Sequence, residues 1–388
     1  MKKILGLLVI AVVILAGCGA KTTSDGLSGK IVVQAEGETY GSYFKAAAEA
    51  FTAETGVEVE IVDASMFDAI EALPTQKGNG PDVMLAPNDR VGELADQKLI
   101  APLTTMVNDY TDTAKSAGNY KDAQYLLPMS TDTTLLIYNK DKIAETPKSI
   151  KELGADKFAA KFTDFYHAAG MFYDQGGYIF GDKNLDTTDV GLSTAEAIKA
   201  GEIFKSFYQS GNETWTLMQD DNVSYDVMMD AFNSGKVDAI LNGPWALTDI
   251  AKAGINYGVA PIPSYDGTGT YSPLVGTKGM VVNAYSKNTE GAQAFVNFLN
   301  TKEYAQKWHE ITKEVSPNTG VAYEEGSEAA IILDATTKGT SMPTDPAFGK
   351  VWGPMKDGLL QIAAGNDVKA SLEAATKVIQ SDIEGMKQ

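Results

Sequence analysis

The chain has 388 residues, and its 51 acidic and 32 basic side chains give it a formal net charge of −19 at pH 7. So acidic a surface argues against binding to nucleic acid and against charge-driven docking on anionic lipid, because both partners are negatively charged. Apolar residues make up 44% of the chain, which is ordinary for a globular protein, and the length predicts two domains or more.

Residues 1–17 have the pattern of a secretory signal and are not expected to belong to the fold. Lys2 and Lys3 supply a positive start, and an apolar stretch over residues 4–15 follows. This stretch is too short for an ordinary transmembrane span, so it predicts a cleaved signal peptide.

The signal runs into Leu15-Ala16-Gly17-Cys18, which resembles the bacterial lipobox, where the cysteine becomes the lipidated first residue. Cys18 is the only cysteine of the chain, so a disulfide framework is excluded. We therefore expect a lipid anchor on Cys18 at the extracellular face of the cell membrane, with the polar residues 18–29 as a tether. A plain cleaved signal with a chance cysteine is the alternative.

One stretch indicates where a ligand would bind. Residues 82–86 form an apolar run of strand length, residues 87–89 form a turn, and residues 90–97 form an amphipathic helix. Asp89 and Arg90 then lie just beyond the carboxyl end of a strand, where open α/β sheets bind ligands. A carboxylate beside a guanidinium suits a neutral polyhydroxyl ligand, since charge-assisted hydrogen bonds are strong. The alternative is that Asp89 caps the helix and Arg90 is solvated.

The segments before and including this strand follow a β-α-β-α-β order, which predicts a parallel sheet with helices on both faces. Residues 36–41 are expected to form a loop, and Pro74 is expected to end the second helix early. The five elements are a strand over residues 30–35, a helix over 42–55, a strand over 57–62, a helix over 66–76 and the strand over 82–86.

Two long β-rich segments, residues 125–138 and 274–283, are suited to crossing between two lobes. Asp164, Phe165 and Tyr166 are expected in a loop before an apolar helix. Further helices are predicted over residues 194–210, 227–234, 288–300, 302–312 and 347–386, the last with a break at residues 365–366, and further strands over residues 237–241 and 257–261.

With these elements in place, the sequence resembles the family 1 extracellular solute-binding proteins of ABC importers, and most closely their maltose- and maltodextrin-binding group from Gram-positive bacteria. The likeness covers nearly the whole mature chain. It is carried by Gly80-Pro81-Asp82 through Asp89-Arg90, by LIYNK at residues 136–140, by residues 231–235 with Asn242-Gly243-Pro244-Trp245, by Asn256-Tyr257-Gly258-Val259 and by Met342-Pro343.

The resemblance implies an α/β type II periplasmic-binding-protein fold with two lobes and three hinge crossings, each lobe a mostly parallel sheet flanked by helices. The N-terminal lobe would comprise residues 30–131 and 276–322, and the C-terminal lobe residues 132–275 and 323–388. The implied function is that of a carbohydrate receptor, which captures maltose or maltodextrins by hinge closure and delivers them to the transmembrane subunits of a permease. Such a receptor would be a monomer without cofactor or metal.

The site residues follow from the resemblance, position by position. The implied polar residues are Glu38, Asp68, Asp89, Arg90, Asp132 and Asp164, the implied stacking residues are Tyr166, Trp245 and Trp352, and Tyr225 would contribute a hydroxyl. This mixture suits a glucose unit, whose apolar faces pack on aromatic planes while its hydroxyls bond to charged acceptors. Core packing of Trp245 or Trp352 and capping by Asp164 are the alternatives.

The chain departs from the family pattern at five positions, so its end subsites are expected to differ in shape. Ala86 stands where Gram-negative members carry a stacking tryptophan. Gly353 stands at a tyrosine position and Lys356 at an arginine position, while Thr39 and Met66 each stand at a lysine position.

Two other functions stay open: a receptor for another oligosaccharide, and a secreted glycoside hydrolase, whose paired carboxylates would also suit a sugar site. Hydrolysis is disfavoured because a cation such as Arg90 lowers the pKa of a neighbouring carboxyl. The sequence has no nucleophile elbow, phosphate loop or zinc-type cluster, so we expect a binding protein and not an enzyme. Asp220, Asp221 and Asp226 do not fit a calcium loop and are expected to be solvated.

Overall fold

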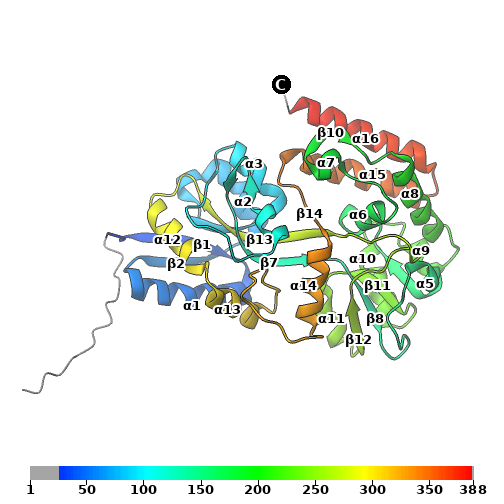
Figure 1. Cartoon of the computed structure of the whole chain (residues 1–388), viewed down its shortest axis with the longest axis horizontal. Coiled ribbons are helices and arrows are strands. Elements are labelled where there is room, and N and C mark those ends of the chain that lie inside the picture. The colour runs from blue at the N-terminus through cyan, green and yellow to red at the C-terminus, as the bar shows by residue number, and fades with distance from the viewer. Residues whose placement is uncertain (1–25, 387–388) are drawn as a thin grey trace, which may run out of the picture.

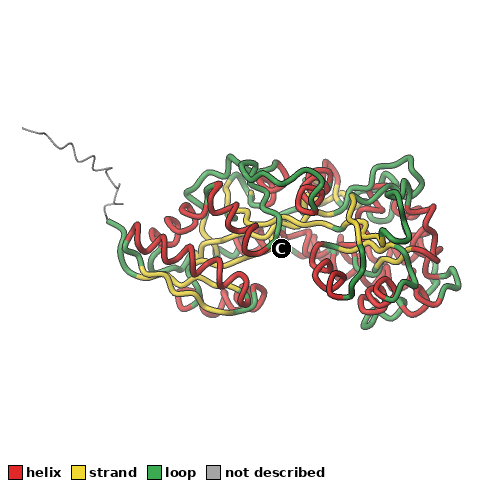
Figure 2. Tube along the Cα trace, turned by 90° about the horizontal axis from the view of Figure 1, so that it is seen from below, coloured by secondary structure: helices red, strands yellow, loops and turns green. Residues whose placement is uncertain are grey.

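The computed structural model describes residues 26–386, which form two lobes side by side (Figure 1). The predicted signal, the lipobox with Cys18 and most of the predicted tether lie outside the described residues. Between residues 26 and 386, no helix combines the length and apolar character that crossing a membrane requires. Helices flank the strands of the lobes (Figure 2), as expected for an α/β protein.

The larger sheet has seven strands, among them β14-β13-β3-β1-β2 in that spatial order. β1 pairs in parallel with β2 and with β3, and helices α1 and α2 pack against these strands. The predicted β-α-β-α-β order is confirmed by β1 (Lys30–Ala35), α1 (Gly37–Thr55), β2 (Glu58–Asp63), α2 (Met66–Gln76) and β3 (Val83–Pro87).

Two local expectations in this region are wrong. The helix α1 begins at Gly37, so most of the expected loop is helical. Gly37 has a φ of 69°, a left-handed conformation that turns the chain from β1 directly into the helix. Pro74 lies inside α2, which continues to Gln76, because a proline in the last turn removes only one helical hydrogen bond.

The chain crosses between the lobes through continuous strands. β7 (Leu127–Thr133) pairs with β13 (Leu274–Asn283) in the larger sheet, and after one residue β8 (Leu135–Asn139) enters the smaller sheet. The expectation that this segment crosses is therefore confirmed, and Thr134 at the change of sheet is buried. β13 has its expected bounds and also pairs antiparallel with β3.

The smaller sheet has the strand order β12-β8-β11-β9. β9 (Phe158–Ala160) and β11 (Ala239–Asn242) are parallel, but β8 runs antiparallel to β11 and to β12 (Tyr257–Ala260). The expectation of a mostly parallel sheet is therefore wrong for this lobe. The reason is that β8 continues the direction of the crossing strand β7 and enters beside the carboxyl end of β11, where Leu135 pairs with Asn242.

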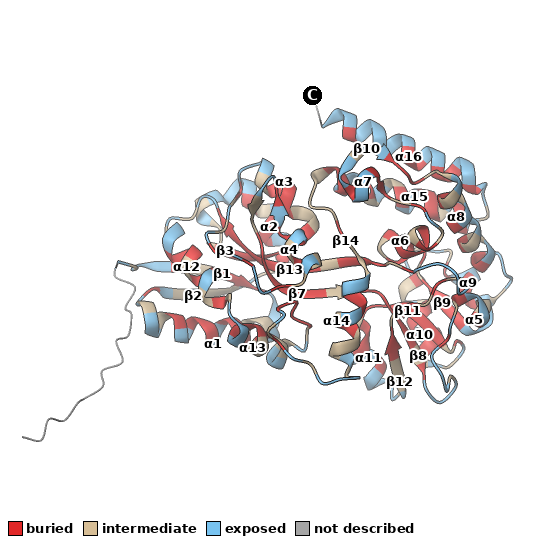
Figure 3. Ribbon diagram, viewed as in Figure 1, coloured by how far each residue is buried: buried red, intermediate tan, exposed pale blue. Residues whose placement is uncertain are grey.

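Each lobe buries its own hydrophobic core, and the buried strands stand out in both lobes of Figure 3. Trp308 on α13 (Lys302–Thr312) is fully buried in the core around the larger sheet. Trp215 is fully buried in the other core, where its indole N–H donates to the Phe158 carbonyl at 2.9 Å. The segment after α13 leads to α14 (Glu328–Lys338) on the second core, which makes the third connection between the lobes within the described residues.

Most of the other predicted segments are confirmed, and the expected break after residue 364 separates α15 from α16. The remaining elements of the first half are η1 (Lys77–Asn79), η2 (Asn88–Arg90), α3 (Val91–Asp96), β4 (Ile100–Ala101), α4 (Asp112–Ala117), β5 (Asn119–Tyr120), β6 (Ala123–Gln124), α5 (Ile150–Lys157), α6 (Phe165–Asp174), α7 (Gly181–Asn184) and β10 (Asp186–Val190). Those of the second half are α8 (Ala195–Tyr208), α9 (Glu213–Leu217), α10 (Ser224–Asn233), η3 (Pro244–Ala246), α11 (Leu247–Lys252), α12 (Thr289–Leu299), β14 (Thr340–Ser341), η4 (Pro346–Lys350), α15 (Trp352–Ala363) and α16 (Val368–Gly385).

Candidate functional site

Most of the expected site residues follow the carboxyl ends of parallel strands. β1, β2 and β3 run in one direction in the larger sheet, and β9 and β11 run in one direction in the smaller sheet. Such strand ends are where α/β sheets bind ligands. The expected residues beyond them are Glu38 after β1, Asp68 after β2, Asp89 and Arg90 after β3, Asp164 after β9 and Trp245 after β11.

One group of expected residues connects the lobes through Asp132 on β7, Tyr166 on α6 and Trp245 in η3. The Tyr166 hydroxyl donates to Asp132 Oδ1 at 3.2 Å. The Trp245 ring lies 6.1 Å from the Tyr166 ring, and it stacks on the His167 imidazole at 6.1 Å with an interplanar angle of 22°. Trp245 nevertheless keeps 44% of its surface exposed, so the core alternative is wrong for this residue.

The expected loop at Asp164 and Tyr166 is wrong, because α6 begins at Phe165. Asp164 caps this helix, and its Oδ1 accepts a hydrogen bond from the Tyr166 N–H at 2.9 Å. The capping alternative for Asp164 is therefore confirmed. A carboxylate has about four lone-pair sites, so a cap leaves capacity to accept from a ligand as well.

Burial dominates the electrostatics of the Asp132 group. It raises the pKa of Asp132, while Lys278 lowers that pKa and Glu314 raises it further. Burial and the charge of Asp132 also hold the pKa of Tyr166 well above its ordinary value. A Cβ atom on Gly276 would lie 2.9 Å from Asp132 Oδ1, so a glycine permits β13 to approach this closely. Hydrogen bonds in such surroundings are stronger than in water.

A second group connects the lobes where η2 meets α15. The Trp352 side chain lowers the pKa of the Asp89 carboxyl as a donor, and both residues line a pocket of about 460 Å³ together with Arg90. The half-buried Trp352 ring packs edge-on against Phe348 at 5.0 Å and Phe165 at 6.1 Å. Trp352 therefore packs against these rings and also lines the pocket, so its packing does not exclude a position in the pocket.

Asp89 does not cap α3. The N-cap position belongs to Arg90, which makes no side-chain cap and whose Nε lies 3.2 Å from Glu93. Burial raises the pKa of Asp89, although the Arg90 charge and the Trp352 hydrogen bond lower it. The helix-cap alternative is therefore wrong. The expectation that Arg90 would hold a neighbouring carboxyl pKa low is also wrong, because desolvation outweighs the attraction.

Three expected residues lie at the margin of these groups. The Tyr225 hydroxyl on α10 accepts from Asn242 Nδ2 at 3.4 Å, at the end of β11. Glu38 and Asp68 are exposed in the first turns of α1 and α2. Within residues 26–386, neither side chain forms a hydrogen bond or ion pair with another expected site residue. Glu38 and Asp68 lie at the same edge of the larger sheet as Asp89, but they do not contact the residues that surround Asp89.

Three residues that sequence reasoning missed adjoin Asp132. Lys278 on β13 places its Nζ 2.6 Å from the Glu314 carboxylate and 2.9 Å from the Tyr40 hydroxyl. These residues are far apart in the sequence, so no local pattern connects them. The available signal was Lys278 itself, the one charged residue in the apolar segment Leu274–Asn283.

Asp221 was expected to be solvated, but its side chain is only 18% exposed and pairs with Lys161 at 3.2 Å and Lys356 at 2.7 Å. The Asp164 charge also acts on Lys356. Asp221 therefore holds two lysine side chains close to Asp164, the cap of α6.

Within the part of the chain that the structure describes, no three histidine, cysteine, aspartate or glutamate residues gather in a way that could hold a metal ion.

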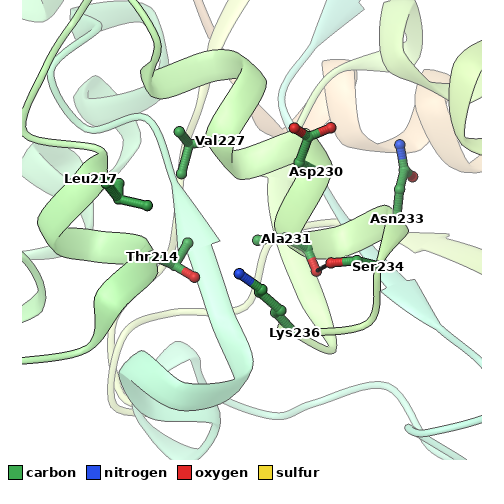
Figure 4. Close-up of a pocket in the computed structure, with 8 residues that line it drawn as sticks. All are labelled: Thr214, Leu217, Val227, Asp230, Ala231, Asn233, Ser234 and Lys236. Atoms are coloured by element: carbon green, nitrogen blue, oxygen red, sulfur yellow. Dashed lines mark hydrogen bonds between the residues drawn. The ribbon is translucent and has the colours of Figure 1, made fainter.

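Another pocket, of about 580 Å³, lies between α9 and α10, and its lining contains none of the expected site residues (Figure 4). Leu217 and Val227 supply its apolar surface, and the Lys236 side chain extends toward Thr214. No aromatic ring lines it. Without an aromatic plane it lacks the feature that packs on the apolar face of a sugar ring.

The fold and the two groups define a two-lobed binding protein, in which strand ends of both lobes present carboxylates and aromatic rings to one region. Comparison with known families agrees with this class. The family model for bacterial extracellular solute-binding proteins matches residues 46–373. The chain belongs to this family.

Curated relatives and solved structures match nearly the whole chain. The maltodextrin-binding protein MdxE of Bacillus subtilis is 31% identical, over 95% of this chain and 94% of its own length. A galactooligosaccharide-binding protein of the same organism is 30% identical, over 95% and 94%. The maltose-binding protein MalE of Listeria monocytogenes in complex with maltose superimposes with a TM-score of 0.84 at 29% identity, covering 92% of this chain and 98% of that protein.

The raised pKa of Asp89 predicts the stability of the Asp89→Asn variant. A carboxyl whose pKa is raised on folding stabilises the fold fully below its unfolded pKa of about 4, and this contribution is lost as the pH rises through the folded pKa. At pH 7 the variant should therefore unfold at an equal or higher denaturant concentration than wild type, and its advantage should disappear near pH 4.

Denaturant melts of both proteins across this pH range measure the effect. A helix cap would behave differently, because asparagine caps a helix about as well as aspartate and the variant would then gain no stability as the pH rises. Asp164→Asn, at the cap of α6, is the matched comparison and should unfold much as wild type does. Unfolding of Asp89→Asn at a lower denaturant concentration than wild type at pH 7 would contradict the burial argument.

Proposed function

We propose that this protein is the carbohydrate receptor of an ABC importer and that it captures maltose or maltodextrins. The observation that carries the proposal is Trp245, an indole stacked on His167 yet 44% exposed, beside the Tyr166–Asp132 hydrogen bond. A large aromatic surface left open next to a buried acceptor fits a ligand with apolar faces and hydroxyl edges. The maltose- and maltodextrin-binding relatives support this choice.

In the proposed mechanism the ligand lies between the lobes and is enclosed when they close on one another by hinge motion. The lobes comprise residues 30–131 with 276–322 and residues 132–275 with 323–388. Trp245, Tyr166 and Trp352 stack on sugar rings, and Asp132, Asp164 and Asp89 accept from hydroxyls. Arg90 donates to the sugar, Tyr225 adds a hydroxyl, and the exposed Glu38 and Asp68 meet the ligand from the larger-sheet lobe.

We propose binding without bond cleavage. The raised pKa values of Asp89 and Asp132 would by themselves suit a general acid, so charge does not separate a receptor from a glycosidase. The argument for a receptor rests on the family, whose description is solute binding. Hydrolysis stays the alternative that an activity assay has to address.

A different oligosaccharide is the nearer alternative. The galactooligosaccharide-binding relative is 30% identical and the maltodextrin-binding protein MdxE 31% identical, each over 95% of the chain, so overall identity does not separate the two ligands. Stacking surfaces and carboxylates serve both, because every pyranose offers apolar faces and hydroxyls. Experiment has to show which glycosidic linkage the protein binds, and whether it prefers the equatorial carbon-4 hydroxyl of glucose or the axial one of galactose.

The proposed cellular setting follows from the N-terminal sequence. Cys18 carries a lipid that anchors a monomeric receptor to the extracellular face of the cell membrane, and the tether over residues 18–29 lets it reach the transmembrane permease subunits. A relative described as a maltooligosaccharide ABC transporter solute-binding lipoprotein, from Streptococcus pneumoniae, supports this setting at 30% identity over 98% of this chain.

A glycan panel tests the ligand class. Maltotriose, maltotetraose and longer α-glucans should raise the melting temperature of the purified mature chain, because a ligand that binds only the folded state stabilises it by mass action. Galactooligosaccharides and cello-oligosaccharides are the comparison. A shift with galactooligosaccharides alone would replace the maltodextrin assignment, and release of glucose or maltose from maltotetraose would replace the receptor by a hydrolase.

Trp245→Ala tests the stacking role. Removal of the half-exposed ring should weaken binding of maltotetraose by about 1–3 kcal/mol in isothermal titration, while the unfolding free energy changes little. The control is Trp215→Ala, which opens a cavity in a buried core and should cost about 3–5 kcal/mol of stability. Trp245→Ala protein with normal affinity would remove Trp245 from the ligand site.

Cys18→Ala tests the anchor. In a Gram-positive host that is fed a labelled fatty acid, the wild-type chain should carry the label in the membrane fraction, and the variant should lose it. Thr23→Ala, within the proposed tether, is the control and should keep both label and location. Unlabelled wild-type protein in the medium would leave residues 1–17 as a plain cleaved signal.

A further inference from the structure

The strongest unexplained feature of the structure is a charge network beside Asp132. Lys278 lies on β13, Tyr40 in the first turn of α1, and Glu314 in the connection that follows α13. The Lys278 ammonium contacts the Glu314 carboxylate at 2.6 Å and the Tyr40 hydroxyl at 2.9 Å, and Tyr40 also donates to Glu314. Lys278 and Glu314 are only 23% and 26% exposed, so their pairing is more than an exposed surface contact.

The network joins segments from both sides of the molecule. Lys278 pairs through its backbone with Pro87 on β3 and with Ser130 on β7, so it lies between the two strands that lead to Asp89 and Asp132. Glu314 is followed directly by Val315, which packs in the core of the smaller-sheet lobe. Tyr40 stacks on Trp308 in the other core at 5.2 Å.

The charges in this region are not balanced pair by pair. Burial alone would lower the pKa of Lys278, but the charges of Glu314, Asp132 and Tyr40 outweigh burial and raise it. Burial raises the pKa of Tyr40 to about 12, so Tyr40 stays protonated as a donor. Glu314 Oε2 is buried without a hydrogen-bond partner. One ammonium therefore pairs with Glu314 and, from a position opposite Ser130 on β7, also acts through its charge on Asp132.

We infer that Lys278 is a positioning residue that keeps Asp132 ionised and oriented as an acceptor for the sugar. The inference rests on the proposed function, because it gives Asp132 a hydroxyl to accept from. Tyr166 alone cannot do this, since a neutral hydroxyl donates one hydrogen bond and supplies no charge to offset burial. Lys278 does not need to touch the ligand, because it lies opposite Ser130, two residues before Asp132 on β7, and its charge acts on Asp132 across the strand pair.

The pH dependence follows with a definite sign. Asp132 accepts from sugar hydroxyls at both oxygens only when it is ionised, so affinity falls as the pH falls through its pKa. The groups that act on Asp132 are Lys278, which lowers this pKa, and Glu314 and burial, which raise it, with Tyr166 as hydrogen-bond donor. Loss of Lys278 therefore moves the fall in affinity to a higher pH, and loss of the Glu314 charge moves it to a lower pH.

The decisive variants differ in one charge. Lys278→Met alone would strand Glu314, so Lys278→Met/Glu314→Gln removes both members of the pair and protects the fold, while Glu314→Gln alone keeps the ammonium for Asp132. Isothermal titration with maltotetraose from pH 5 to pH 8 should show the double variant at least about fivefold weaker than Glu314→Gln at pH 7, with its fall in affinity beginning at a higher pH than in that variant. Glu314→Gln should bind as wild type or better.

Lys142→Met is the matched control, because Lys142 forms an ion pair with Asp238 at 3.0 Å on the smaller-sheet lobe, outside the network. It should leave affinity and its pH profile unchanged. In an Asp132→Asn background the double variant should add no further loss. An equal loss in that background, or the same affinity and pH profile in the double variant as in Glu314→Gln, would overturn the inference.

Carbon NMR titration of the Asp132 carboxyl tests the same assignment without sugar and so separates it from the proposed function. The titration of Asp132 should lie at a higher pH in the double variant than in Glu314→Gln, which should titrate at a lower pH than wild type, and Lys142→Met should not move it. Equal titration in the double variant and in Glu314→Gln would overturn the inference even if sugar binds. If the Asp132 titration differs between the variants as expected but the wild-type chain binds no oligosaccharide, the proposed function is wrong and Lys278 is still the cation that acts on Asp132.

Discussion

Partial burial of two carboxylates, Asp89 and Asp132, is the constraint on which the candidate site depends. A buried charge is costly unless it is paired and hydrogen-bonded, and the cost grows as water is excluded. Asp132 receives the Tyr166 hydroxyl and the field of Lys278, while Asp89 receives the Trp352 hydrogen bond and the field of Arg90. Neither set saturates a carboxylate, so both groups keep acceptor capacity, and a polyhydroxyl ligand supplies the missing donors.

The crossing strands explain why the surroundings of these two carboxylates depend on both lobes. β13 is hydrogen-bonded to β3 on one side and to β7 on the other, which fixes the ends of both strands against each other. Asn88, beside Asp89, reinforces this arrangement: it donates to the Met342 carbonyl at 2.9 Å and accepts from the Thr277 N–H at 3.0 Å. Each carboxylate then bonds to a residue carried by the smaller-sheet lobe. A ligand between them therefore contacts groups whose spacing depends on how the lobes meet.

Local pattern was enough to predict elements whose signals lie within a few residues of each other. β1, β13 and α13 have the expected bounds because periodic apolar residues and short turns define them. The antiparallel insertion of β8 was missed because direction in a sheet is set by distant strands. The positions of Asp89 and Trp245 followed from strand ends and from the family resemblance, whereas the partners Trp352, His167 and Lys278 come from segments that only the fold brings together. The sign of the Asp89 pKa shift was missed for the same reason, since adjacency to Arg90 is visible in the sequence and burial is not.

The network also shows how a strongly acidic chain can present a site for a neutral ligand. The charge of −19 belongs to the whole chain, but each buried or half-buried carboxylate in this region has a cation acting on it: Lys278 for Asp132, Arg90 for Asp89, and Lys161 with Lys356 for Asp221. These cations lower the pKa of the carboxylates and so offset part of the cost of burial, although burial still leaves the pKa values of Asp89 and Asp132 raised. Binding of an uncharged sugar then exchanges hydrogen bonds and changes no net charge, so the affinity should depend on the geometry of these pairs and only weakly on salt, which screens buried charges much less than exposed ones.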